Sequence, residues 1–108
     1  MVDNKLYAAN AGDSRAVLSR KSKLVSLSKD HKPEDQIEKK RIIAAGGTVD
    51  KGRINSHLNL SRSIGDLHYK RNGLLLAEEQ IIIAKPDVVE VELTKNDDFI
   101  IIGCDGVW

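Results

Sequence analysis

Two aspartates in this sequence lie at expected strand ends, where a carboxylate can hold a metal ion or act as an acid. Asp105 follows the apolar run from Phe99 to Gly103 and precedes Gly106, which permits a sharp turn or a close approach to the backbone. A strand that ends in a carboxylate holds that group on rigid backbone. An Asp-Gly pair after a strand is also an ordinary turn signal, so both interpretations stay open.

Asp13 lies in the break Gly12-Asp13-Ser14-Arg15 between two expected strands. The simpler interpretation is a tight turn in which the aspartate caps backbone amides. The alternative is that Asp13 and Asp105 both end strands and point to one side of a sheet. Such a site of hard oxygen ligands would suit Mg²⁺ or Mn²⁺. Zinc is disfavoured, because the sequence has no Cys/His pairs at zinc spacing.

Three further polar residues have both a structural and a chemical interpretation. His31 lies in a turn, where a histidine more often caps a helix or packs than acts as a catalytic acid. Arg15 and Arg62 could bind phosphate, or each could pair with a nearby acid, Asp13 or Asp66, and hold a turn. No glycine-rich phosphate loop and no Gly-x-Ser-x-Gly elbow is present.

The composition indicates one small globular domain. The chain has 108 residues, 41% hydrophobic and 31% charged. The net charge of +1 suggests neither a nucleic-acid partner nor a membrane surface. Aromatic residues make up only 4% of the chain, so few side chains could stack on the bases of a single-stranded nucleic acid. Cys104 is expected to be a buried, inert thiol at the end of the last strand. A single cysteine is compatible with a reducing intracellular compartment, the cytoplasm or the nucleus.

Strand patterns dominate the elements that must position these residues, with one clear helix near residues 34–45. Pro33 is expected to open this helix and Gly46-Gly47 to end it, with Ile37 and Ala44 on the face that packs on a sheet. Strands are expected at 5–10, 16–20, 24–28, 81–84, 88–93 and 99–103. The first three are expected to form an antiparallel meander, and the last is expected to be buried on both faces. A small hairpin is expected to turn at 51–52. The predicted fold class is α+β, a helix packed on part of a larger antiparallel β-sandwich.

The two ends of the chain are unusually apolar for a natural domain, because the sequence stops at Trp108 directly after core-like residues. We therefore expect residues 1–108 to be part of a longer domain. Sheet edges left uncovered in such a part would favour self-association with a second copy or another chain.

A set of motifs, in order, resembles the metal-dependent protein serine/threonine phosphatases, the type 2C or PPM family. The motifs lie at 9–18, 27–33, 45–47, 59–66, 85–88 and 99–108. The resemblance implies the central part of a catalytic domain that is a β-sandwich flanked by helices. It also implies hydrolysis of phosphoserine and phosphothreonine in proteins with two or more Mg²⁺ or Mn²⁺ ions.

Position by position, the resemblance implies that Asp105 is a metal ligand and that Asp13 belongs to an additional, weaker metal site. It places a flap involved in substrate selection at about 45–66. The family's recurring motif positions there are expected to be structural: Asn55, Ser61, Arg62 and Asp66.

The family's N-terminal arginine, acidic pair and Asp-Gly-His-Gly motif have no match in this sequence, and its later Asp-Asn motif is expected beyond Trp108. With few metal carboxylates, the chain alone is expected to bind metal weakly and to be inactive. The alternative is a catalytically inactive relative that binds phosphorylated partners or acts as a scaffold.

Overall fold

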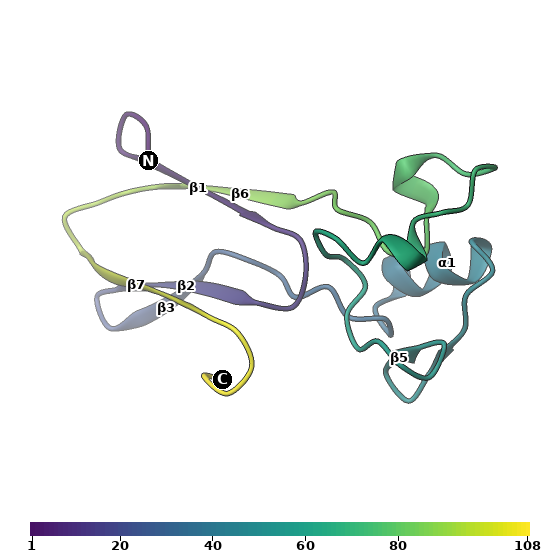
Figure 1. Ribbon diagram of the computed structural model, residues 1–108. Coiled ribbons are helices and arrows are strands. Elements are labelled where there is room, and N and C mark those ends of the chain that lie inside the picture. The colour runs from purple at the N-terminus through teal and green to yellow at the C-terminus, as the bar shows by residue number, and fades with distance from the viewer. The chain divides into compact units, whose positions relative to one another are not determined.

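A computed structural model describes residues 1–108, which form two units (Figure 1). The first unit comprises residues 1–10, 14–30 and 86–108, and the second comprises 11–13 and 31–85. Antiparallel strands and a single α-helix account for most of the regular structure, as the predicted α+β class requires. None of the helices has the length and apolar character needed to cross a bilayer.

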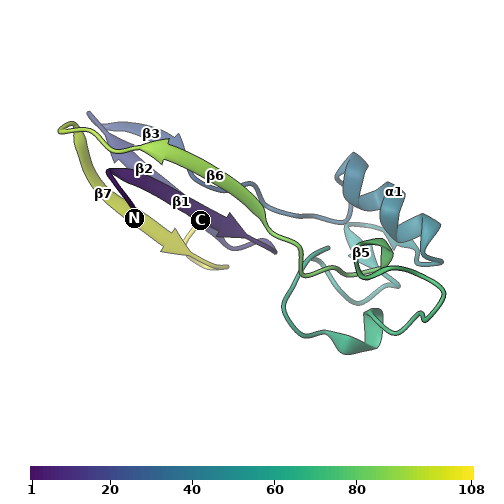
Figure 2. The same ribbon diagram turned by 90° about the horizontal axis from the view of Figure 1, so that it is seen from above.

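The first unit contains two antiparallel sheets. One pairs β1 (Lys5–Asn10) with β6 (Asp87–Glu92), and the other has the order β3 (Lys23–Ser26), β2 (Arg15–Arg20), β7 (Asp97–Gly103). Figure 2 shows the two-stranded sheet lying over the three-stranded one. Side chains of β1, β2 and β7 line the cleft between the sheets.

The predicted meander is wrong in one of its pairings. β2 and β3 form the expected hairpin, but β1 pairs with β6 instead of β2. β2 takes β7 as its second neighbour, and this distant pairing is reinforced where Arg20 donates to Asp97 over 2.6 Å and to the carbonyl of Glu92. The polar loop between β6 and β7 therefore connects two sheets and does not close a hairpin. Local sequence patterns predict strands, but they do not specify pairings between distant segments.

The final strand is also less buried than predicted. β7 is the outer strand of its sheet, and Phe99 is 58% and Ile102 is 78% exposed. Cys104 is exposed as well, so the prediction of a buried thiol is wrong. The apolar run predicts a strand correctly, but the position of β7 at the edge of its sheet leaves these side chains exposed.

The second unit is built on α1 (Gln36–Ala44), β4 (Val49–Asp50) and β5 (Arg53–Ile54). Its core is a cluster of three fully buried isoleucines, Ile42, Ile54 and Ile82. The predicted hairpin turn is confirmed: Lys51 and Gly52 have φ angles of 49° and 73°, the left-handed pair that a tight hairpin turn requires.

Three details of the second unit differ from prediction. Pro33 lies in a buried turn before the helix, which begins at Gln36. Residues 81–84 make only one bridge, from Ile83 to Arg62, and supply core side chains without forming a strand. Two 3₁₀ turns, η1 (Leu67–Tyr69) and η2 (Ala77–Glu79), were not expected.

The helix buries a different face from the predicted one. Ile37 is 72% exposed and Ala44 is exposed, whereas Glu38 and Ile42 are buried. The apolar periodicity is misleading here because a charged side chain occupies the buried face, and its charge is satisfied by arginines that only the folded chain brings together.

Candidate functional site

Asp13 belongs to a tight junction in the second unit between residues 11–13 and the turn at 31–32. The backbone amide of Gly12 donates to Nδ1 of His31 at 3.1 Å, and the amide of His31 donates to the carbonyl of Gly12 at 2.9 Å. His31 is only 2% exposed. The histidine therefore packs at a turn, as its structural interpretation predicts, and holds the backbone beside Asp13.

The carboxylate of Asp13 is paired with a lysine. Nζ of Lys32 donates to Oδ2 of Asp13 at 2.6 Å, and only 15% of the Asp13 side chain is exposed. An ammonium group so close supplies the positive charge that a metal ion would otherwise bring. Any cation that binds Asp13 must compete with Lys32.

Asp105 is presented differently, in a turn at the end of β7 in the first unit. The amide of Val107 donates to the carbonyl of Cys104, and Gly106 has a φ of +91°, which favours glycine. A Cβ atom on Gly103 would lie 2.9 Å from Val107, so the turn packs closely on the strand end. The Asp105 side chain itself is exposed, and no other side chain pairs with its carboxylate.

The side chains around this strand end form a small ordered group. Arg15 makes two hydrogen bonds to Asp30, at 3.1 and 2.8 Å, and its guanidinium lies 5.4 Å from the ring centroid of Trp108. The Trp108 indole donates to the carbonyl of Gly103 at 3.0 Å. Arg15 therefore holds a turn, but its partner is Asp30 and not the predicted Asp13.

The two aspartates flank the same end of one strand pair in sequence. β2 begins two residues after Asp13, β7 ends two residues before Asp105, and the register pairs Arg15 with Gly103. Their oxygen donors suit Mg²⁺ or Mn²⁺, but two carboxylates are fewer than the roughly six ligands such ions take. No group of three or more histidine, cysteine or acidic side chains in the structure could hold a metal ion.

A buried charge cluster lies around Glu38 of α1 in the second unit, and the sequence alone did not reveal it. Its carboxylate accepts from Nε and Nη2 of Arg62 at 2.7 and 2.9 Å, from Ser61 at 2.9 Å and from Arg41 at 3.1 Å. The Glu38 side chain is 3% exposed and that of Arg62 is 9% exposed. The predicted alternative for Arg62, an ion pair, is correct in kind, but the acid is Glu38 and not Asp66.

The cluster stabilises the charged form of its acid. Burial by itself would raise the pKa of Glu38, but the hydrogen bonds from Arg62 and Ser61 and the charge of Arg41 outweigh it, and the pKa falls from 4.5 to about 2. Glu38 therefore remains a carboxylate at any physiological pH. The only sequence signal was the three-residue spacing from Glu38 to Arg41, which is common on exposed helices.

The other predicted motif residues make local backbone contacts. Asn55, with a φ of 48°, accepts a hydrogen bond from the amide of Thr48 at 2.9 Å. Asp66 has a left-handed conformation and accepts from the hydroxyl of Ser63. Neither lies in the Glu38 cluster, and both hold turns.

The sequence of this chain matches a known protein family. The family model described as "Protein phosphatase 2C" matches residues 1–108, so the chain belongs to the protein phosphatase 2C family. "Protein phosphatase 2C 1" of Paramecium tetraurelia is 57% identical over 105 residues, which are 97% of this chain and 35% of that protein. "Protein phosphatase 2C homolog 2" of Hypocrea jecorina is 56% identical over 105 residues, or 97% of this chain and 24% of that protein.

Solved structures agree with the sequence comparison. The chain is similar to the crystal structure of a phosphatase from a pathogenic strain of Toxoplasma gondii, with a TM-score of 0.87 and 42% identity over 95% of this chain and 32% of that one. The chain thus spans about a quarter to a third of the length of these relatives. The α+β sandwich fragment predicted from the sequence is the fold observed.

Proposed function

We propose that the whole protein to which this chain belongs is a Mg²⁺- or Mn²⁺-dependent phosphatase that removes phosphate from phosphoserine and phosphothreonine in proteins. The observation that carries this proposal is the family match over residues 1–108. The resemblance of the motifs that contain Asp13 and Asp105 supports it. Relatives from a ciliate and a fungus, both named protein phosphatases, support it.

The chain's own residues supply part of the required chemistry. When bound, a divalent ion lowers the pKa of a coordinated water and offsets charge on the phosphoryl group. Asp105 would bind such an ion through an exposed carboxylate at the end of a paired strand. Asp13 would bind a second, weaker ion in exchange for its contact with Lys32, at 2.6 Å. The remaining ligands must come from water or from other segments of the whole protein.

A phosphatase assay tests this proposal. The substrate is a phosphothreonine peptide with Mn²⁺, and the proteins compared are the whole protein, its Asp105→Asn variant and the 108-residue chain alone. We expect activity in the whole protein, a loss of at least about 100-fold in Asp105→Asn, and none in the chain alone. Asp3→Asn, an exposed aspartate in a turn, is the matched control and should keep full activity.

The alternative function is a catalytically inactive module that binds phosphorylated partners or serves as a scaffold. The contact between Lys32 and Asp13 is the observation that favours it, because that carboxylate is already neutralised without a metal. An inactive whole protein that retains all its metal carboxylates would support the module and refute the enzyme. An active 108-residue chain would refute the argument that its carboxylates are too few.

A further inference from the structure

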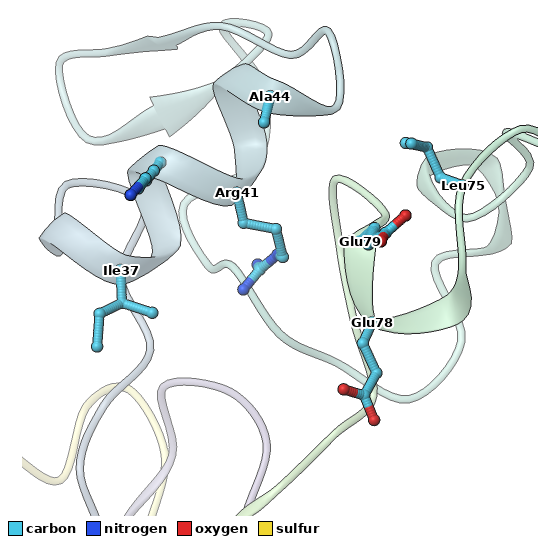
Figure 3. Close-up of a pocket in the computed structure, with 7 residues that line it drawn as sticks. Ile37, Arg41, Ala44, Leu75, Glu78 and Glu79 are labelled. Carbon is cyan, nitrogen blue, oxygen red and sulfur yellow. The ribbon is translucent and has the colours of Figure 1, made fainter.

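A groove in the second unit lies away from both aspartates in sequence and carries a distinctive pattern of side chains (Figure 3). One wall is α1, with Ile37, Lys40 and Ala44; the other is the segment around η2, with Leu75, Glu78 and Glu79. Its volume of about 580 Å³ is within the range of pockets that bind ligands.

The groove is held in shape by hydrogen bonds beneath it. From α1, Arg41 donates to the carbonyls of Ser61 at 2.6 Å, Gln80 at 3.1 Å and Ile81 at 3.2 Å. The Gln80 side chain in turn donates to the carbonyls of Asn72 at 2.8 Å and Leu75 at 3.1 Å. Hydrogen bonds of Arg41 and Gln80 therefore connect the two walls, so a ligand would not have to order them on binding.

Apolar side chains remain exposed along this groove. Ile37 on the helix is 72% exposed, and Leu76 beside the opposite wall is also 72% exposed. A single exposed apolar side chain is ordinary, but Ile37 lines the groove together with Ala44 and Leu75, so the centre of the groove is apolar.

The two walls carry opposite charges. The side chain of Lys40 on α1 has no hydrogen-bond or ion-pair partner in the structure. Across the groove, Glu78 makes only an exposed pair with Lys85 at 3.1 Å, and Glu79 accepts from the amide of Leu76. A complementary ligand therefore has an apolar centre, a cation facing the two glutamates and an anion facing the lysine.

We propose that this groove docks a short segment of a partner protein in which an apolar side chain lies between a basic and an acidic residue. The helix wall from Ile37 to Ala44 is about 10 Å long, which about three residues of extended chain would span. The apolar side chain would insert between Ile37, Ala44 and Leu75. The site does not include either aspartate, and its existence does not depend on phosphatase activity.

Fluorescence anisotropy with three labelled seven-residue peptides tests the proposal on the whole protein at low salt. The peptides differ only in their central three residues, which are Glu-Leu-Lys, Glu-Ser-Lys or Glu-Leu-Glu. We expect saturable binding of the first and at least about tenfold weaker binding of the second, because the leucine anchor is lost. The third should bind several-fold more weakly than the first.

Protein variants then locate the binding. Ile37→Asp should abolish binding, whereas Ile43→Asp, on the same helix and 56% exposed but outside the groove, should leave it unchanged. Glu78→Lys should reverse the preference, so that Glu-Leu-Glu binds more tightly than Glu-Leu-Lys. None of these three variants should alter Mn²⁺-dependent hydrolysis of a minimal phosphothreonine peptide, which separates this proposal from the proposed function.

Three results would overturn the proposal. The first is the absence of saturable binding of Glu-Leu-Lys at millimolar concentration. The second is equal weakening by Ile37→Asp and Ile43→Asp, which would indicate a change in the fold. The third is a whole protein that dimerises and becomes monomeric on Ile37→Asp, because a second copy would then occupy the groove.

Discussion

Replacing Glu38 by glutamine would remove the charge around which the second unit is organised. The side chain keeps its size, but the guanidinium of Arg62, 9% exposed, loses its carboxylate, and Arg41, 11% exposed, loses one of its partners. Leaving a buried charge without its partner costs about 3–5 kcal/mol. The fall of the Glu38 pKa from 4.5 to about 2 corresponds to about 3 kcal/mol, which agrees with that range.

Amide hydrogen exchange in the whole protein measures this loss locally. We expect Glu38→Gln to lower the free energy of opening of α1 by about 3 kcal/mol at pH 7. The matched control is Glu90→Gln, which removes a half-exposed pair with Lys5 and should cost no more than about 0.5 kcal/mol. Replacing both Glu38 and Arg62 by methionine should restore part of the loss, because neither charge is then left unpaired.

The same cluster predicts a pH dependence with a definite sign. Because the folded pKa is lowered, the stabilisation by Glu38 is fully present above about pH 4.5 and is lost as the pH falls towards 2. In Glu38→Gln this acid-dependent part of the opening free energy of α1 should disappear. A loss below about 1 kcal/mol at pH 7, or an unchanged acid profile, would refute the role assigned to the cluster.

Three further predictions concern other features of the chain. Lys32→Met should raise the affinity of the weakest site of the whole protein for Mn²⁺ by about tenfold, because Asp13 loses its competing cation. Electron paramagnetic resonance measures this affinity, and Lys29→Met is the control. An affinity that Lys32→Met leaves unchanged would refute the competition. Gly12→Ala should destabilise the second unit by about 1–3 kcal/mol, as measured by hydrogen exchange. The φ angle of Gly12 is +141°, and the new Cβ would lie 3.1 Å from the carbonyl oxygen of Arg62. The control Gly73→Ala should be nearly neutral, because no atom beyond its chain neighbours lies within 4 Å of its new Cβ. The 108-residue chain alone should self-associate in sedimentation experiments, because β7 leaves an exposed sheet edge. Phe99→Lys on that strand should weaken self-association more than the control Leu74→Lys does. A folded monomer at low concentration would contradict this prediction.

The sequence predicted those parts of the fold that depend on local chemistry. The hairpin turn at Lys51-Gly52 was predictable because a glycine stands between two short strand-like runs, and β6 was predictable from alternating apolar side chains. Pairings were not, because the partner of β2 lies far along the chain in β7 and nothing in the local pattern of β2 specifies it.

The candidate site was predictable to a similar degree. Asp13 and Asp105 stand out because each follows or precedes glycine at a strand boundary, and their metal-binding role stays a prediction. Lys32 as the partner of Asp13 could not be read from the sequence, because it lies 19 positions away. Glu38 was missed for a different reason: burial of a charged residue depends on Arg62, which only the folded chain brings to it.

The pairing of β2 with β7 has a consequence for how the chain acquires its structure. Arg20 and Asp97 are separated by 77 positions, and the entire 31–85 segment lies between them. During synthesis, the hairpin of β2 and β3 therefore keeps one unpaired edge until β7 has been synthesised. A topology of this kind has a high contact order, which favours slow folding and exposes an intermediate to aggregation. Loop-closure entropy rises only with the logarithm of length, at about 0.6 kcal/mol for each doubling, so the inserted segment could change greatly in size at little cost to the sheets.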